Sequence, residues 1–397
     1  PSLGFTGNMD TYKPAEGSAT RSDIAITDPD FKYPSLWKSN IAADYKFGDG
    51  WVATVELLYS KDINAIYHDN IGLYRTEQFV NDGGAGNARP YYNGYYSDRE
   101  GNQKAANHVV MLRNTSKGHS LYTTFQLQKN FVDGILKGLY LNGSYSFGQS
   151  RGVTDGTSSV ATSAWKYRAA LDGNAEEVGY TAGSFDGRLL LSASYTANWS
   201  KYAATSFGLI YQRYRPFRYS YCYNGDANGD SQFSNDLMYI HANFDEVKDH
   251  LLPGDFDSQE DAWKAMNAFI EQDPYLSKHR GEYAERNGAV APFANQLDLS
   301  VSHDIKIYQK NGRSHTLRFS FNIANFLNLL NRNWGVVQTT VLGNQQYQFL
   351  TIPKGQGPSA ANNYTLKYTM AKDLDETFKD NLNDVSRWQM QFGIKYI

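Results

Sequence analysis

Oxygen-bearing side chains occupy alternate positions in the segment DANGDSQFSND, which begins at Asp226. In this spacing, Asp226, Asn228 and Asp230 can curl around a calcium ion, and the backbone carbonyl of Gln232 can supply a further ligand. Asp236 is the nearest acid that could close the shell. The segment therefore predicts a Ca²⁺ site made by Asp226, Asn228, Asp230, Gln232 and Asp236, the one cofactor that we expect.

The same segment departs from the EF-hand pattern at two positions. The sixth position is Ser231 instead of glycine, and the twelfth is Leu237, with Asp236 one place early. Without a bidentate acid at the twelfth position, a calcium site is expected to be weaker or different in shape. A solvated turn has the same Asn, Asp and Gly composition, so that interpretation stays open.

Tyrosine is concentrated in two further segments, RPYYNGYYSDRE and FRYSYCYNG. Tyrosine offers rigid, amphipathic contact area for a peptide or a sugar. We therefore predict substrate contacts from Tyr91, Tyr92, Tyr95, Tyr96, Tyr219, Tyr221 and Tyr223. The alternative is that these rings line strands that extend beyond a main sheet.

A helix is predicted from Ser258 to Gln272. Asp257 or Ser258 can cap its first turn, which carries acidic residues, and Pro274 ends it. The residues with helical spacing on its apolar face are Trp263, Met266, Phe269 and Ile270. This pattern favours a helix packed on its own loop over a helix that docks a partner.

Other classes of site find little support. The histidines are scattered, and neither an H-E-x-x-H nor a G-x-S-x-G motif is present. We therefore expect no enzyme activity. The net charge of −3 and the pI near 6.3 give no basic surface for nucleic acid. The single cysteine, Cys222, rules out an internal disulfide framework.

The elements that must position these segments are strands. The last stretch, Asp384 to Ile397, is the clearest, because large apolar residues alternate there with polar ones. Its apolar series is Trp388, Met390, Phe392, Ile394 and Tyr396. The same alternation recurs in Asn40–Phe47, Trp51–Lys61, His119–Lys129, Gly138–Gly148, Arg188–Trp199, Ser206–Arg215, Asn295–Ile307 and His315–Phe326. Strands of ~9–12 residues match the length that crosses a bilayer at a tilt.

Short turns alternate with long loops between these strands. The short turns are Gly48–Gly50, Asn130–Lys137, Ser200–Thr205 and Tyr308–Ser314, and the long polar loops run roughly Asp62–Gly118, Gln149–Gly187, Pro216–Ala294 and Leu327–Val385. Such loops are unusual in compact soluble domains and typical of outer-membrane barrels. The pattern predicts an all-β, antiparallel transmembrane barrel, with aromatic girdles at the strand ends. A secreted β-sandwich or a propeller array is the alternative.

Several segments also resemble the Oar-like type of TonB-dependent outer-membrane receptor. They include NGDANGDSQFSNDLMYI, LRFSFNIANFLNLLNRNWG and SRWQMQFGIKYI, and the resemblance covers nearly the whole chain. It implies a 22-stranded barrel in the Gram-negative outer membrane with extracellular loops. On that basis residues 1–38 are an extracellular loop segment, and residues 39–397 are the C-terminal portion of the barrel, about nine strands, with the plug and the earlier strands absent.

The resemblance implies transport of a large nutrient such as a peptide or an oligosaccharide. A surface adhesin or a protein-export component could use the same barrel, and this alternative stays open. The implied partners are the missing N-terminal part of the receptor and, through it, the TonB complex, together with the lipid bilayer. The resemblance also allows a surface lipoprotein as a partner, and nucleic acid is not expected.

Overall fold

A computed structural model describes residues 23–82, 88–95, 108–156, 158–310, 313–342, 346–358, 364–370 and 376–397. Its largest element is an antiparallel sheet of ten strands. Nine of them follow one another in the order β2-β3-β8-β9-β11-β12-β18-β19-β25, and β10 (Gly179–Tyr180) pairs with β9 beside this path. The fold is therefore all-β, as the sequence predicts.

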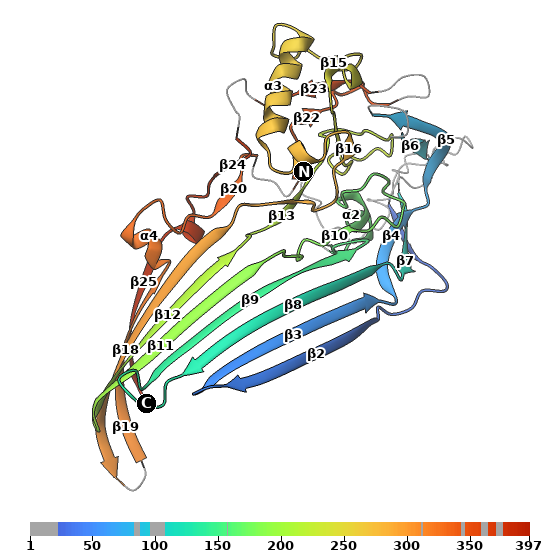
Figure 1. Ribbon diagram of the computed structural model, residues 1–397. Helices are drawn as coiled ribbons and strands as arrows, with labels where there is room; N and C mark the ends of the chain where they lie inside the picture. Colours follow the sequence, from blue (N-terminus) through green and yellow to red (C-terminus); the bar gives the residue numbers. More distant parts are fainter. Residues whose placement is uncertain are drawn as a thin grey trace, which may run out of the picture.

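The nine consecutive strands match the nine predicted ones. They are β2 (Leu36–Phe47), β3 (Trp51–Asp62), β8 (Gly118–Asn130), β9 (Leu139–Gly152), β11 (Arg188–Ser200), β12 (Ala203–Tyr214), β18 (Ala294–Lys310), β19 (Arg313–Ala324) and β25 (Gln389–Tyr396). Figure 1 shows them as a long, twisted and curved sheet, with the short turns and the C-terminus at its lower end. Within the described residues, β2 and β25 form the two edges, each paired on one side.

The register sorts the side chains onto two faces. Directly paired residues of neighbouring antiparallel strands lie on the same face. One row consists of Leu141, Ala193, Leu209, Leu299, Ile323 and Met390. We call the face that carries this row the apolar face. A row on the opposite face consists of Ser300, Asn322 and Gln391, and we call that face the polar face. The predicted alternation is thus confirmed across the sheet.

The long connections fold together at the end of the sheet opposite the short turns, in a region that we call the loop domain (Figure 1). Its small sheets join segments from different loops, as in the parallel pairing of β1 with β7 and of β13 with β21. Its strands are β1 (Ile24–Thr27), β4 (Ala65–Asn70), β5 (Leu73–Asn81), β6 (Ala88–Tyr95), β7 (Val109–Thr115), β13 (Arg218–Tyr221), β14 (Tyr239–Ile240), β15 (Leu251–Leu252), β16 (Glu282–Tyr283), β17 (Ala289–Val290), β20 (Gln338–Thr340), β21 (Gln346–Tyr347), β22 (Leu350–Thr351), β23 (Leu366–Tyr368) and β24 (Phe378–Asp380).

Helices in the described ranges are few and mostly short. They are α2 (Ala161–Lys166), α3 (Gln259–Gln272) and α4 (Phe326–Leu330), with 3₁₀ turns η2 (Phe244–Glu246), η3 (Leu276–Lys278) and η4 (Asp384–Ser386). In α3 the hydroxyl of the predicted cap Ser258 accepts the N–H of Asp261 at 3.1 Å. Met266, Phe269 and Ile270 of α3 are buried in the main core of the loop domain. The predicted helix, packed on its own loop, is confirmed.

Two predicted boundaries need correction. The last strand begins at Gln389, one residue after the start of the predicted apolar series at Trp388, and Asp384–Ser386 of the last stretch form the 3₁₀ turn η4. The sheet also begins before residue 39, since β2 starts at Leu36. Of the predicted loop segment 1–38, residues 1–22 lie outside the described residues, and Ile24–Thr27 form a strand of the loop domain.

Candidate functional site

Burial is distributed differently in the sheet and in the loop domain. The main hydrophobic core consists of loop residues, and Phe269 in it is 1% exposed. On the apolar face, Phe392 and Ile394 of β25 are 67% and 63% exposed, and Leu191 in the middle of the sheet is 42% exposed. Contiguous apolar surface of this extent marks contact with another protein or with a membrane.

Aromatic rings lie at both ends of the apolar face. At the short turns, Phe47 stacks on Trp51 with ring centroids 6.2 Å apart, and Trp199 donates a hydrogen bond to Thr205 at 2.8 Å. At the other end, Phe147 stacks on Tyr145 at 5.7 Å. These rings are partly or largely exposed, and the tyrosine and tryptophan among them carry the polar group that suits a boundary between an apolar medium and water.

The polar face carries hydrogen bonds between side chains of neighbouring strands. Gln126 donates to Asn142 at 2.8 Å, and Gln212 donates to Gln296 at 3.0 Å. The two N–H groups of Arg318 bond to both carboxylate oxygens of Asp304. Because these groups keep their polar partners while half-exposed, the face is suited to an aqueous environment.

The asparagine-rich segment FNIANFLNLLNRNWG spans the end of β19 and the start of the connection from β19 to β25. Asn325 has a left-handed backbone (φ 52°), and its Nδ2 donates to the carbonyls of Gly335 at 2.9 Å and Ser386 at 3.1 Å. Its own N–H donates to Asp298 at 2.8 Å. The close approach of the two residues requires glycine at position 335, since a Cβ there would lie 2.0 Å from Oδ1 of Asn325. The segment therefore has a structural role in fixing the last strand.

The predicted calcium loop is wound tightly around its own carboxylates. Asp226 accepts backbone N–H groups from Asn228 at 3.2 Å, Gly229 at 2.6 Å and Ser231 at 2.8 Å. The same pattern recurs two and four residues later. The side chain of Asn228 accepts the backbone N–H of Asp230, and the side chain of Asp230 accepts the backbone N–H of Gln232. Ser231 adopts a left-handed backbone (φ 66°), so serine here follows the path that glycine usually follows in such loops.

Asp236 is engaged elsewhere. One of its oxygens pairs with Arg89 of β6 at 3.1 Å, and the other accepts the N–H of Ala227 at 2.8 Å. Arg89 also binds Asp82 at 3.1 Å, and all three side chains are buried. Burial opposes the charge of Arg89, but the two carboxylates outweigh it and raise the pKa of the guanidinium. The positive charge of Arg89 is thus shared between Asp82 and Asp236.

The remaining carboxylates of this loop lack such a partner. Burial raises the pKa of Asp226, against the effect of the backbone N–H groups that it accepts. Burial raises the pKa of Asp230 to about 7, with the nearby charge of Asp226 acting in the same direction. In the described part of the chain, no lysine, arginine or histidine forms an ion pair with either residue. No basic side chain of the described residues therefore neutralises these two carboxylates when they ionise.

The loop also contacts the first tyrosine segment. The N–H of Tyr92 donates to the carbonyl of Asn228 at 2.7 Å, and the hydroxyl of Tyr92 donates to Asp172 at 2.6 Å. A Cβ at Gly229 would lie 2.1 Å from the carbonyl oxygen of Tyr92, so only glycine permits this approach. Two segments that the sequence singled out separately are therefore in contact.

The predicted substrate tyrosines lie mostly inside the loop domain. Tyr91, Tyr92, Tyr219, Tyr221 and Tyr223 are buried, Tyr95 is partly buried, and Tyr96 lies outside the described residues. Tyr221 donates a 2.6 Å hydrogen bond to the buried Asp273. These rings form a core, which argues against direct contact with a ligand at the surface. Tyr219 does line a pocket of about 410 Å³, together with Arg215, Tyr275, Lys278, His279 and Phe378.

Sequence reasoning missed Arg89, Asp82 and Asn235. Arg89 and Asp236 are 147 residues apart, and no local pattern connects them. Asn235 stands within the predicted loop beside Asp236, and its amide is buried against Asp230. Asn235 is outside the EF-hand positions, but its side-chain oxygen within the same segment was a signal that could have identified it.

Acidic side chains alone do not make a metal site here. Within the ranges that the structure describes, no group of three or more His, Cys, Asp or Glu side chains has metal-binding geometry. A cation in this loop would need amide and carbonyl oxygens in addition to carboxylates.

Among the described helices, none has both the length and the apolar character needed to cross a membrane. Comparisons of the chain with protein-family models, curated proteins and solved structures gave no match.

Proposed function

We propose that this chain forms the C-terminal portion of a 22-stranded, TonB-dependent outer-membrane transporter that takes up a large nutrient such as a peptide or an oligosaccharide. The single observation that carries the proposal is the inverted distribution of apolar side chains. Phe392 and Ile394 on the sheet are exposed, while the loops hold the buried core. Lipid is the environment in which such a sheet face is stable.

The ends of the sheet support the same proposal. Short turns on one side and a folded loop domain on the other match the periplasmic turns and extracellular loops of outer-membrane barrels (Figure 1). The polar face, with Gln126, Asn142 and Arg318, then lines the water-filled interior. Because open sheet edges do not occur in hydrocarbon, β2 and β25 pair with further strands of the same barrel.

Uptake is tested with the intact gene product in its own cell. Fractionation is expected to find it in the outer membrane, and deletion of the gene should abolish accumulation of a labelled peptide or oligosaccharide mixture. Depletion of TonB should have the same effect as the deletion, because the resemblance implies energised transport. Unchanged uptake in both strains, with loss of surface attachment or of a secreted protein, would instead support the adhesin or export alternative.

The pocket beside Tyr219 is the candidate for substrate contact in the loop domain. It combines Lys278 and Arg215, which is paired with Asp186, with the carboxylate of Asp273 and the rings of Tyr275 and Phe378. This mixture of charged and aromatic groups suits a polar peptide or sugar. A Lys278→Ala variant that retains normal surface amounts should take up less of such a substrate. Equal uptake by this variant and the wild type would remove the pocket from the proposal.

A further inference from the structure

The loop that begins at Asp226 contains two carboxylates that form no ion pair with a basic side chain of the described residues. Asp230 is fully buried and Asp226 is partly buried, and Oδ2 of Asp230 is met only by side-chain amides. The nearby guanidinium of Arg89 is committed to Asp82 and Asp236. Two desolvated carboxylates without a cation are costly, unless they bind a proton or a metal ion.

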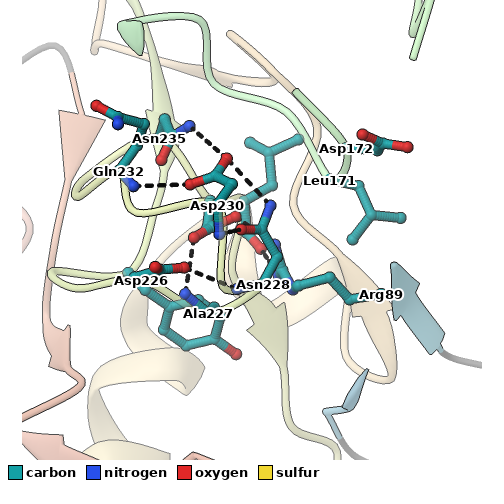
Figure 2. Close-up of polar contacts among 12 residues, drawn as sticks. Arg89, Leu171, Asp172, Asp226, Ala227, Asn228, Asp230, Gln232 and Asn235 are labelled. Atoms are coloured by element: carbon teal, nitrogen blue, oxygen red, sulfur yellow. Dashed lines mark hydrogen bonds and ion pairs between the residues drawn. The ribbon is translucent and has the colours of Figure 1, made fainter. Parts of the chain in front are cut away.

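An unpartnered amide oxygen lies at the same place. Asn235 is 2% exposed, and its Oδ1 has no hydrogen-bond partner among the described residues. Its Nδ2 lies 3.5 Å from Oδ2 of Asp230, which also receives Nδ2 of Asn228 at 3.3 Å. Figure 2 shows the amides of Asn228 and Asn235 turned toward the Asp230 carboxylate. A buried polar atom without a partner is rare in native proteins, and a cation beside Asp230 would give this oxygen one once the amide turns its Oδ1 toward the loop.

We propose that Asp226, Asn228, Asp230 and Asn235, with the carbonyl oxygen of Gln232, bind a Ca²⁺ ion. Rotation of the Asn235 amide about its last bond exchanges its nitrogen and oxygen, and so directs Oδ1 at the cation. The donors are two carboxylates, two amides and one carbonyl, all of them oxygen. Asn235 takes the place that the sequence gave to Asp236.

The donor set favours calcium over magnesium. Ca²⁺ accepts six to eight oxygen ligands in irregular geometry, whereas Mg²⁺ requires a near-octahedral shell and keeps several of its waters. Neutral amide and carbonyl donors on an irregular loop therefore fit Ca²⁺ better than Mg²⁺. With only two carboxylates, the expected dissociation constant is in the range of extracellular calcium modules, ~0.1–1 mM.

A cation at this point fastens several loops together. The ligand Asn228 holds β6 through its carbonyl, which accepts the N–H of Tyr92 at 2.7 Å. Tyr92 in turn donates to Asp172 of the preceding long loop, and a Cβ added at Gly173 of that loop would lie 3.6 Å from Oδ2 of Asp230. Calcium at the ligand positions therefore stabilises the contacts between these loops, and its removal should loosen the loop domain while leaving the nine-stranded sheet intact.

The inference is tested on the intact gene product, purified in detergent micelles and stripped of metal with a chelator. Calorimetric titration with CaCl₂ should show one saturable site per chain, half-saturated at ~0.1–1 mM. The unfolding temperature followed by near-ultraviolet circular dichroism should rise with calcium concentration. These measurements do not depend on the transport proposal, because they report on the loop domain whether or not the barrel imports a nutrient.

Matched variants identify the ligands. Asp230→Asn should lower the calcium affinity at least tenfold, yet unfold in chelator at the same or a higher temperature than the wild type, because a buried charge is lost. Asn235→Leu removes Oδ1 at similar volume and should also weaken binding. Asp245→Asn, at a side chain 83% exposed, is the control and should bind calcium normally.

Two results would overturn the inference. One is the absence of saturable calcium binding in the wild-type chain. The other is calcium binding by Asn235→Leu and Asp230→Asn that is equal to that of the wild type, which would show that any bound ion sits elsewhere. If Asp230→Asn does not fold, Asn235→Leu alone decides between these outcomes.

Discussion

Arg318 of β19 lies opposite Asp304 of β18, and its Nε and Nη2 donate to the two carboxylate oxygens at 2.6 and 2.7 Å. The pair belongs to the polar face, whereas the next residue, Phe319, belongs to the apolar face beside Ile394. Successive side chains in a strand point to opposite sides. A charged pair and an apolar surface are thus separated only by the thickness of one sheet.

Charge is expected to be tolerated on one face only. In the lipid-embedded protein, Phe319→Arg should lower the free energy of unfolding by ~2–4 kcal/mol, because it places a charge in hydrocarbon. Ser320→Arg, one residue along on the polar face, is the matched control and should cost less than ~1 kcal/mol. Reversible urea unfolding in phospholipid vesicles measures both, and equal losses would contradict the assigned faces.

The loop domain should depend on Arg89. Replacement by methionine leaves Asp82 and Asp236 buried without a counter-charge, and should cost ~3–5 kcal/mol of loop-domain stability. Lys264→Met removes a cation from a surface pair whose side chains are 74% and 44% exposed, and should cost less than ~1 kcal/mol. Protease resistance of the loops reports both variants. An Arg89→Met protein as resistant as the wild type would refute this role.

In the asparagine-rich segment, substitution of Asn325 should lower the stability of the protein, and substitution of Asn333 should not. Asn325→Ala leaves the carbonyls of Gly335 and Ser386 without their donor and should cost ~1–3 kcal/mol. Asn333→Ala, at an exposed position of the same segment, should stay within ~0.5 kcal/mol of the wild type. Chemical unfolding compares the two variants. Similar effects in both would show that the segment does not fix the last strand in this way.

Acid should destabilise the loop domain through His241. Burial lowers the pKa of His241 to about 3, with the ring of His250 acting in the same direction, against its hydrogen bond to the carbonyl of Asp82. Since this folded-state pKa lies below the unfolded value of about 6.5, the neutral ring contributes stability above pH 6.5. That stability is lost as pH falls below about 6.5, amounting to ~2 kcal/mol at pH 5.

A His241→Gln variant isolates this effect, because glutamine can still donate to the Asp82 carbonyl and does not titrate. Its unfolding temperature should fall less steeply than that of the wild type between pH 7 and pH 5. The comparison of slopes is needed because the raised pKa values of Asp226 and Asp230 act in the opposite direction. Parallel slopes would show that His241 does not control the acid response.

The sheet could be predicted from the sequence because its pattern is local. Alternation of apolar and polar residues with a period of two sufficed to find each of the nine strands, and their order along the chain is their order in the sheet. The start of the last strand was misplaced because Trp388 continues the alternation, although the chain before it forms the 3₁₀ turn η4.

The loop domain could not be predicted in the same way. Its contacts join residues far apart in the sequence, such as Arg89 with Asp236 and Tyr92 with Asn228. Tyrosine density predicts substrate contact, with strands beyond the main sheet as the alternative, and Tyr219 and Tyr221 are buried in the short strand β13. Their spacing of two residues was the available signal for that strand.

The proposed membrane barrel depends most on contact between the apolar face and lipid. Spin labels attached after Leu191→Cys and Ser192→Cys substitutions, each in a Cys222→Ala background, test adjacent residues on opposite faces. In outer-membrane lipid vesicles, the label at position 191 should be reached by oxygen and shielded from a water-soluble nickel chelate, and the label at position 192 should show the reverse. A label at 191 that is open to the nickel chelate, with the label at 192 shielded from it, would contradict the proposal that this sheet is part of a membrane barrel.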